Sequence, residues 1–352
     1  MTLKKIETYT RYLEIVERYG QKGCASNDFI QREAADLVVH DLLYESCGEK
    51  NAFVLVKKEG FYRVYYYIND YSELLVVPEE TLETEILFRG MIGEPTEVVE
   101  YLERCGFKRL FVRDQYAAMY KDLQPSTPNE EIIVQPALTL VGVKSAFDLF
   151  NQSFDKYSGD YVSPEHYEAL LASGNVLMAW RKEENETMFL GALHQSMENN
   201  VAWISHVAVK ESVRGRHVGR ALMDTFVERN MNSEKSRYML WVQKQNKPAV
   251  AMYEKKGFSY SGKSSLSMIK KTTLYSMEKL MELLKGIRPD VDFENEAALI
   301  DDGILDSFDV VSIISEIDDL FGVQIRINVL DPESFNSAEN IWNMIQELKA
   351  KP

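Results

Sequence analysis

Cysteine and long apolar runs are scarce in this chain of 352 residues. Its three cysteines, Cys24, Cys47 and Cys105, have spacings that fit neither a metal knuckle nor a redox pair. No stretch approaches the roughly 18 apolar residues of a membrane helix, and the opening Met1–Thr10 holds no apolar run that would serve as a signal peptide. We therefore expect reduced thiols, a cytoplasmic location and no membrane insertion.

A net positive charge is also absent, since 40 basic against 55 acidic side chains give −15. This sign argues against nucleic acid or an anionic membrane as a partner. The imbalance is uneven: residues 205–271 carry 14 basic and 5 acidic side chains, whereas residues 272–352 carry 6 and 17. The apolar fraction of 45% excludes a disordered chain, and the length favours two or three domains.

Two blocks that mix strands and helices precede a block of short helices joined by acidic loops. Each of the first two ends in a helix that breaks at glycine before a phenylalanine, at Gly106-Phe107 and at Gly257-Phe258. The proline-containing stretch Asp122–Pro128 is typical of a linker. These features predict three domains, over residues 1–135, 136–271 and 272–352.

The central block contains a buried strand that leads through an Arg- and Gly-rich turn into a helix, over Val201–Ala221. The helix is expected to start near Gly219, and free backbone N–H groups at a helix start bind phosphate. Arg214, Arg216 and Arg220 add charge that suits a pyrophosphate. The alternative is a basic turn on the surface of an α/β domain.

A second pattern follows, in which Asn246, Ala249 and Tyr253 fall three and four residues apart along one helical stripe. A small residue in the middle leaves room for a ligand between helix and strand. A tyrosine O–H beside that gap could donate a proton to a departing thiolate. The alternative is that Tyr253 is a packed core aromatic.

Together these residues resemble the GNAT acetyltransferase family, over roughly Leu138–Ile269. The pyrophosphate motif of that family, Arg/Gln-x-x-Gly-x-Gly/Ala, reads here Arg214-Gly215-Arg216-His217-Val218-Gly219. His217 stands in the place of the first motif glycine. The resemblance implies acetyl-CoA or another acyl-CoA as donor, its diphosphate held by the backbone amides of Val218, Gly219, Arg220 and Ala221.

The same resemblance implies roles for four other positions. The backbone of Val207 and Val209 would bind the acyl carbonyl and the pantetheine arm, Asn246 would contact that arm, and Tyr253 would be the general acid. These roles describe transfer of an acyl group from a thioester to an amine.

The general base is less defined, because Trp203 stands where many members of the family carry glutamate. His206 is our candidate, with His194 as a second histidine nearby and a water relay as a further possibility. His206 is expected to share a strand face with Ala202, Ile204 and Ala208, so a buried structural histidine is the alternative.

The first block looks GNAT-like in its element order and its Gly106-Phe107 ending. Between the expected strands Leu74–Val77 and Glu85–Phe88, however, lies Pro78–Thr84, which has no glycine and three carboxylates that would repel a pyrophosphate. We expect a degenerate partner domain without a donor site.

The last block centres on the start of a predicted helix, Ser307–Phe321. Asp306 is a natural N-cap, and Asp309 adds negative charge to the first turn. Ser307 is then exposed at the positive end of the helix, where an attached phosphodiester is favoured. The alternative is a capped serine on an acidic helical bundle.

The stretch Gly303–Phe308 resembles the attachment motif of acyl carrier proteins, and the likeness extends over about Leu274–Leu348. Its wording, together with Asp331–Asn340, looks most like D-alanyl carrier proteins and other stand-alone aminoacyl carriers. The resemblance implies 4′-phosphopantetheine on Ser307, added by a phosphopantetheinyl transferase, and a carrier-loading adenylating ligase as partner.

We therefore expect an α+β fold class: two α/β GNAT folds with tandem mixed sheets flanked by helices, followed by an all-α four-helix acyl-carrier bundle. The expected enzyme is an N-acyltransferase of a biosynthetic pathway, which moves an acetyl or acyl group from CoA to the amine of an amino acid on the Ser307 arm. In one alternative the arm carries the acyl donor for a soluble amine. In another, inactive GNAT folds form a docking platform.

Overall fold

The computed structural model describes residues 3–75, 80–124, 131–155, 157, 162, 164–182, 187–233, 236–271, 277–321, 323, 325 and 332–350. The strands run in chain order as β1 (Lys4–Lys5), β2 (Ala25–Ser26), β3 (Leu43–Cys47), β4 (Ala52–Lys58), β5 (Phe61–Ile68), β6 (Leu82–Arg89), β7 (Lys108–Met119), β8 (Ile132–Pro136), β9 (Val176–Lys182), β10 (Thr187–Glu198), β11 (Val201–Val209), β12 (Arg237–Gln243) and β13 (Ser259–Lys270). The α-helices are α1 (Tyr9–Tyr19), α2 (Ala34–Val39), α3 (Thr96–Arg104), α4 (Leu140–Ser153), α5 (Tyr167–Ser173), α6 (Val218–Arg229), α7 (Lys247–Lys256), α8 (Met277–Ile287), α9 (Ser307–Phe321) and α10 (Ala338–Ala350).

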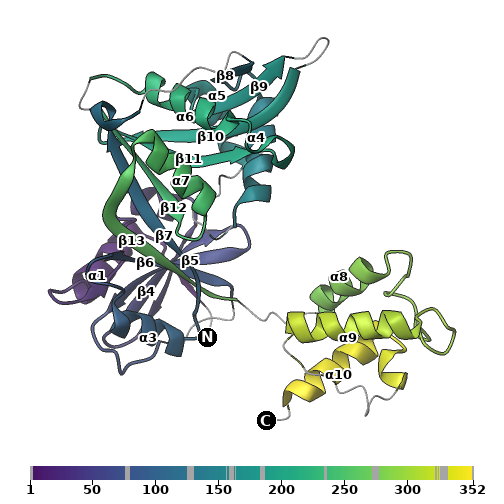
Figure 1. Cartoon of the computed structure of the whole chain (residues 1–352). Helices are drawn as coiled ribbons and strands as arrows, with labels where there is room; N and C mark the ends of the chain where they lie inside the picture. Colours follow the sequence, from purple (N-terminus) through teal and green to yellow (C-terminus); the bar gives the residue numbers. More distant parts are fainter. Residues whose placement is uncertain are drawn as a thin grey trace.

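All of these strands belong to one mixed sheet flanked by helices, shown in Figure 1. The order is β1-β3-β4-β5-β6-β13-β7-β12-β11-β10-β9-β8, with β2 paired to β5. The pairs β5/β6 and β11/β12 are parallel, and the other neighbours are antiparallel. The mixed sheet with flanking helices was expected, but the expected tandem sheets are joined into one.

The join is made by an exchange of strands between the two halves of the sheet. Each half ends in a helix and a strand, α3–β7 in the first and α7–β13 in the second. Strand β13 pairs with β6 and β7, and β7 pairs with β13 and β12, so each final strand lies within the other half. Backbone hydrogen bonds therefore cross the predicted boundary between residues 135 and 136.

That boundary also falls inside β8, which pairs with β9 of the second half. The predicted linker Asp122–Pro128 begins in a 3-10 helix, Tyr120–Asp122, and its residues 125–128 lie outside the described part of the chain. The boundary predicted at residue 272 likewise lies in 272–276, outside the described residues.

A glycine precedes each of the exchanged strands, Gly106 before β7 and Gly257 before β13. Gly106 and Gly257 adopt φ values of 92° and 107°, a left-handed conformation that favours glycine. A side chain at Gly257 would also collide with the backbone oxygen of Asp122. The turn that ends α7 is therefore packed directly against the chain that leaves β7.

Apolar side chains cover both faces of the sheet. In the second half, Leu222 and Phe226 of α6 pack on one face, and Val143 and Phe147 of α4 pack on the other. Because successive strand residues point to opposite faces, membership of these two cores shows which way each side chain in β11 and β12 points.

Helices α8–α10 form a separate apolar core, to which Leu280, Ile313, Phe335 and Ile341 contribute. Within the described residues this region holds three α-helices and a short 3-10 helix, Pro332–Phe335. The helical character agrees with the sequence analysis, whereas the expected four-helix bundle stays a prediction.

Candidate active site

Strands β11 and β12 are paired over only part of their length. The parallel register runs from Val201 opposite Arg237 to Ile204 opposite Leu240, and it stops there although both strands continue. Beyond this point, over His206–Val209, β11 pairs with β10 alone among the described residues. The edge of β11 that faces β12 thus offers the backbone groups of Val207 and Val209 to an extended ligand.

A β-bulge marks the point where the two strands part. Gln195 lies opposite Ile204 and His194 lies opposite His206, so Ser205 is an extra residue in β11. The bulge reverses the alternation: Ile204 belongs to the core under α6, whereas Ala208 belongs to the core under α4. His206 therefore shares its face with Ala208 but not with Ala202 and Ile204, which corrects the sequence expectation.

The Arg- and Gly-rich turn leads into α6, as the sequence predicted. The first helical hydrogen bond runs from the amide of Ala221 to the oxygen of His217, at 3.0 Å. The amides of Val218, Gly219 and Arg220 precede it and are the donors of the helix start. The amide of Ala221, included in the predicted phosphate site, is already used by the helix.

Two residues of the turn before α6 have left-handed backbone conformations. Gly215 has a φ of 79° and His217 a φ of 64°, and His217 occupies the N-cap position without a side-chain cap. Arg214 and Arg216 are exposed in this turn. Gly219 permits close packing of α6 on α7, since a Cβ there would lie 3.0 Å from Sδ of Met252.

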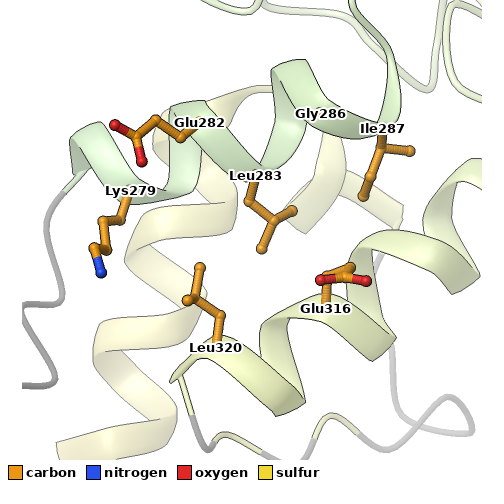
Figure 2. Close-up of a pocket in the computed structure, with 7 residues that line it drawn as sticks. All are labelled: Lys279, Glu282, Leu283, Gly286, Ile287, Glu316 and Leu320. Atoms are coloured by element: carbon orange, nitrogen blue, oxygen red, sulfur yellow. The ribbon is translucent and has the colours of Figure 1, made fainter. Parts of the chain in front are cut away.

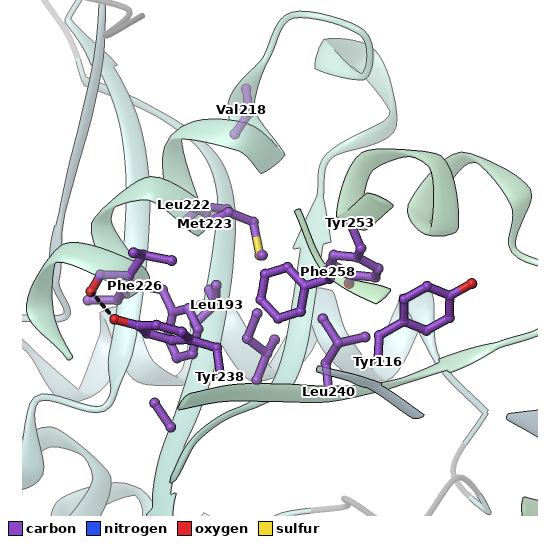
Figure 3. Packing of buried hydrophobic residues seen from close by; sticks show 14 of the residues in the cluster. Tyr116, Leu193, Val218, Leu222, Met223, Phe226, Tyr238, Leu240, Tyr253 and Phe258 are labelled. Carbon is purple, nitrogen blue, oxygen red and sulfur yellow. Dashed lines mark hydrogen bonds between the residues drawn. The ribbon is translucent and has the colours of Figure 1, made fainter. Parts of the chain in front are cut away.

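Tyr253 lies in the core beneath α6. It is 5% exposed, and its ring centroid is 6.2 Å from that of Phe258. Figure 3 shows both side chains in this core. Burial raises the pKa of Tyr253 above its ordinary value, so the hydroxyl stays protonated at neutral pH. A general acid must be in that state when a thiolate departs.

Asn246 begins α7 as its N-cap, with Oδ1 accepting a hydrogen bond from the amide of Ala249 at 3.3 Å. Its side chain is exposed. Because the oxygen is used by the cap, the amide nitrogen is the group that remains for the predicted contact with a pantetheine arm.

His206 is enclosed by aromatic rings. Its ring centroid lies 5.1 Å from Phe150, 5.3 Å from Phe154 and 5.8 Å from His194. Burial, and secondarily the charge of Arg113, lowers the pKa of His206 to about 4. An imidazole with so low a pKa is a weak base, and this argues against His206 as the general base.

The first half has a matching gap between its parallel strands, but its own chain fills it. Strands β5 and β6 pair only as far as Val64 opposite Thr84. Beyond that point Asn27, 2% exposed, donates to the oxygen of Glu85 at 2.8 Å and accepts from the amide of Tyr66 at 2.7 Å. The position equivalent to the β11 edge is closed.

The chain between β5 and β6 also lacks a helix start, in so far as residues 69–75 and 80–81 are described. Leu74 and Leu75 lie outside any strand, contrary to the prediction, and Val76 and Val77 lie outside the described residues. Strand β6 begins at Leu82 rather than at Glu85. The expected elements were therefore misplaced, and the expectation of a first half without a donor site stays a prediction.

A buried group of four charged side chains was missed by the sequence analysis. Arg63 Nε donates to Glu83 Oε2 at 2.9 Å, and Arg113 donates to Glu85 at 2.5 Å. Burial raises the pKa of Glu83 to about 7, whereas Arg113 outweighs burial at Glu85 and holds its pKa below the ordinary value. The sequence analysis placed Glu83 in the loop Pro78–Thr84 and not in a strand, so it gave no indication that this side chain is buried in the sheet.

Ser307 is exposed and is the first residue of α9. Oδ1 of Asp306 accepts hydrogen bonds from the amides of Phe308 and Asp309, at 2.8 and 2.9 Å. Oδ2 of Asp309 in turn accepts from the amide of Asp306 at 3.1 Å and from Arg288 at 2.6 Å. This reciprocal cap between Asp306 and Asp309 fixes the helix start, and its hydrogen bonds do not involve the side chain of Ser307.

A hollow of about 400 Å³ lies between α8 and α9, with Leu283, Ile287 and Leu320 along it and Lys279, Glu282 and Glu316 beside them (Figure 2). Glu316 and Leu320 lie nine and thirteen residues beyond Ser307, so the hollow is roughly 14–20 Å along α9 from the serine, at 1.5 Å per residue. It is therefore separate from the helix start.

In the described part of the chain, no helix is long and apolar enough to cross a membrane. Across the same residues, no group of three or more His, Cys, Asp or Glu side chains is placed to hold a metal ion.

Comparison with known proteins assigns both regions. Residues 143–258 match the model of the acetyltransferase (GNAT) family. The C-terminal region is 32% identical over 76 residues to a D-alanyl carrier protein from Bacillus velezensis, a match that covers 97% of that protein and 21% of this chain. The chain thus contains a GNAT acetyltransferase domain, and its C-terminal region is similar to a D-alanyl carrier protein.

Solved structures are similar at low sequence identity. A GCN5-related N-acetyltransferase from Sphaerobacter thermophilus is 14% identical, with 77% of this chain and 95% of that chain covered and a TM-score of 0.48. A tandem GNAT protein from the clavulanic acid biosynthesis pathway is 12% identical, with 76% and 97% covered and a TM-score of 0.46.

Proposed function

We propose that the chain is an N-acyltransferase that acylates the amine of an amino acid held as a thioester on a Ser307-linked arm. The contrast between the two strand gaps carries this proposal. The gap beside β11 leaves the edge at Val207 and Val209 unpaired, whereas Asn27 fills the gap beside β5. One half of the sheet thus retains a place for a pantetheine arm.

The donor would be acetyl-CoA or another acyl-CoA. The amides of Val218, Gly219 and Arg220 precede the first helical hydrogen bond of α6 and would bind its diphosphate. Gly215 lets the chain turn into this helix, and Arg214 and Arg220 would add positive charge. The backbone of Val207 and Val209 would pair with the arm and stabilise the oxyanion.

The reaction forms a C–N bond and breaks the C–S bond of the donor thioester. The amine attacks the acyl carbonyl and loses one proton to solvent. The departing thiolate takes a proton from Tyr253, which burial keeps protonated. Solvent then returns a proton to the tyrosinate, so that amide and free thiol are the products.

The carrier region would present the acceptor. Ser307 would receive 4′-phosphopantetheine from a phosphopantetheinyl transferase, and an adenylating ligase would load the amino acid onto it. Tethering in one chain raises the local concentration of the acceptor to roughly the millimolar range when the linker spans the two sites. Residues 272–352 would then be a carrier domain joined to a transferase that comprises both halves of the sheet.

The test is intact mass of the full chain after three steps: arm attachment by a phosphopantetheinyl transferase, loading with an amino acid, and addition of acetyl-CoA. We expect the mass of one acetyl group on the loaded arm. Ser307→Ala should abolish loading and acylation, whereas Ser312→Ala, on the same helix, should retain both. Full production of the acylated amino acid by Ser307→Ala would contradict the proposal.

The reversed arrangement, in which the arm carries the acyl donor, is favoured by one observation. His217 takes a left-handed backbone conformation where the family motif has glycine, and a donor borne on the arm needs no adenosine pyrophosphate site. Robust acylation of the loaded amino acid from free acetyl-CoA would exclude this arrangement.

A further inference from the structure

The open gap beside β11 has two faces, and the proposed donor uses one of them. Val218, at the start of α6, and Tyr253 both belong to the core under α6. A donor with its diphosphate at that helix start and its thiol near Tyr253 enters the gap from this face. The amine of the acceptor must therefore approach the acyl group from the opposite face of the sheet, on which α4 packs.

Two tryptophans lie on that opposite face, at the point where β11 and β12 part. The residues on both sides of Trp203 in β11, and on both sides of Trp241 in β12, belong to the core under α6, so the two indoles point to the face of α4. Trp203 lies opposite Met239, and Trp241 is the first residue of β12 beyond the paired register, which ends at Leu240. Both indoles therefore border the closed end of the gap.

Trp241 lies close to the place proposed for the acyl carbonyl. Val207 is three residues beyond the last pair of the register, of which the bulge takes up one, whereas Trp241 is one residue beyond that pair. The two residues are thus offset by roughly 3.3 Å along the strands and separated by more than a strand spacing of about 4.8 Å across the gap. An amino acid whose amine lies at Val207 can therefore place its side chain on this indole.

Aromatic rings flank this end of the gap. His206, in β11 just after the bulge, packs against Phe150 and Phe154 and is 7% exposed. Trp203 and Trp241 are partly exposed, although the strand residues beside them are buried. A ligand on this face therefore meets indole rings, which stabilise apolar groups by burial.

A charged side chain has little to gain at this place. The guanidinium carbon of Arg113 is 5.9 Å from the ring centroid of Trp241, and Arg113 donates to Glu85 at 2.5 Å. Burial first, and then the charge of Arg113, lowers the pKa of His206, so a second cation is disfavoured on this face. An anion would have to compete with Glu85 for the same guanidinium. An uncharged, apolar side chain meets neither obstacle.

We propose that Trp241 binds the side chain of the acceptor, so that the amino acid preferred on the Ser307 arm has an uncharged, apolar side chain. This inference rests on the proposed function and adds the class of amino acid. The apolar side chain leaves water for the indole, while the amine stays beside Val207 and attacks the acyl carbonyl.

The test compares two cargoes of nearly the same shape on the full chain. Apo protein is loaded on Ser307 with leucyl- or asparaginyl-pantetheine, transferred from the corresponding aminoacyl-CoA, and acetylation by acetyl-CoA is followed by intact mass. We expect the leucyl cargo to react at least about tenfold faster, because the asparaginyl amide would lose its hydrogen bonds to water. Trp241→Ala should bring the two rates within about threefold, mainly by slowing the leucyl cargo, with the KM for acetyl-CoA unchanged. Trp241→Phe should retain most of the preference.

Trp180→Ala is the matched control, because Trp180 is also a partly exposed tryptophan on the face of α4 but lies on β9. This variant should keep the leucyl preference. Each ratio of rates is taken within one protein, so a loss of folded protein affects both cargoes alike. Equal rates for the two cargoes in the unaltered chain, or a preference that survives Trp241→Ala, would overturn the inference while leaving the proposed function intact. Absence of acetylation with both cargoes would overturn the inference and the proposed function together.

Discussion

Arg113 in β7 lies opposite Gln243 in β12, although the two residues come from different halves of the chain. On its other edge, β7 pairs with β13, which itself lies beside β6 of the first half. The final strands of the two halves have thus exchanged places, so each half of the sheet contains a strand from the other half of the chain.

A fragment of residues 136–271 should therefore fail to fold alone. It leaves one edge of β12 unpaired because β7 is missing, and both edges of β13 unpaired because β6 and β7 are missing. It also loses Tyr116 and Ala118 from the core under α6. We expect aggregation or a non-cooperative thermal transition, measured by size exclusion and circular dichroism. Residues 1–271, which keep every strand, should give a cooperative monomer. A monomeric, cooperatively folded 136–271 fragment would contradict the exchange.

Tyr253→Phe should lower kcat for acyl transfer by about 10²-fold, because the variant cannot protonate the departing thiolate. The KM for acetyl-CoA should change by less than about twofold. Steady-state release of CoA thiol measures both. Tyr238→Phe, in the same core but hydrogen-bonded to the oxygen of Val227, is the control and should affect stability alone. Undiminished turnover by Tyr253→Phe would show that Tyr253 is not the general acid, whereas absence of turnover by the unaltered chain would favour the docking-platform alternative.

His217→Gly should stabilise the fold by up to about 1 kcal/mol and tighten acetyl-CoA binding, because glycine adopts the left-handed φ without steric cost. Thermal unfolding and calorimetric titration with acetyl-CoA measure the two effects. Asn200→Gly relieves a similar φ of 63° in the β10–β11 turn and should affect stability only. Weaker acetyl-CoA binding by His217→Gly would instead indicate that the histidine side chain contributes to the site.

The buried imidazole of His206 should make the fold sensitive to acid. Its pKa falls from an ordinary value of 6.5 to about 4, so the unfolded chain takes up a proton between these pH values while the folded chain does not. Above pH 6.5 this group leaves the free energy of unfolding unchanged. As the pH falls from 6.5 toward 4, the free energy of unfolding decreases by about 3 kcal/mol, because the unfolded chain binds the proton and the folded chain does not.

His206→Phe removes this titration and keeps an aromatic ring among Phe150 and Phe154. The difference in unfolding free energy between the variant and the unaltered chain should therefore shift by about 3 kcal/mol in favour of the variant between pH 7 and pH 4. Urea unfolding followed by tryptophan fluorescence measures it. Parallel losses in both proteins would show that His206 is protonated in the folded chain.

Local signals in the sequence placed the ends of several elements well. The predicted start of a helix at Gly219 is one residue from the start of α6, and the predicted helix Ser307–Phe321 coincides with α9. In both places the cause is a short-range one. A glycine-rich turn and an aspartate N-cap act within a few residues, which the sequence displays directly.

Two features depend on contacts that are distant in the sequence, a third depends on the register of a hairpin, and the sequence analysis missed all three. The exchange of β7 and β13 depends on which strand edges meet, the bulge at Ser205 on the pairing of β10 with β11, and the burial of Glu83 on cover from the other half. Alternation alone assigned His206 to the wrong face, since one extra residue reverses every later side chain in the strand.

The exchanged strands also impose an order on synthesis. When β6 and β7 leave the ribosome, their partner β13, Ser259–Lys270, has not been made. The early chain must therefore hold two open strand edges until almost all of the transferase has been translated. Closure of the sheet becomes a single late event, timed by elongation, and the carrier region is the part of the chain that emerges while it takes place.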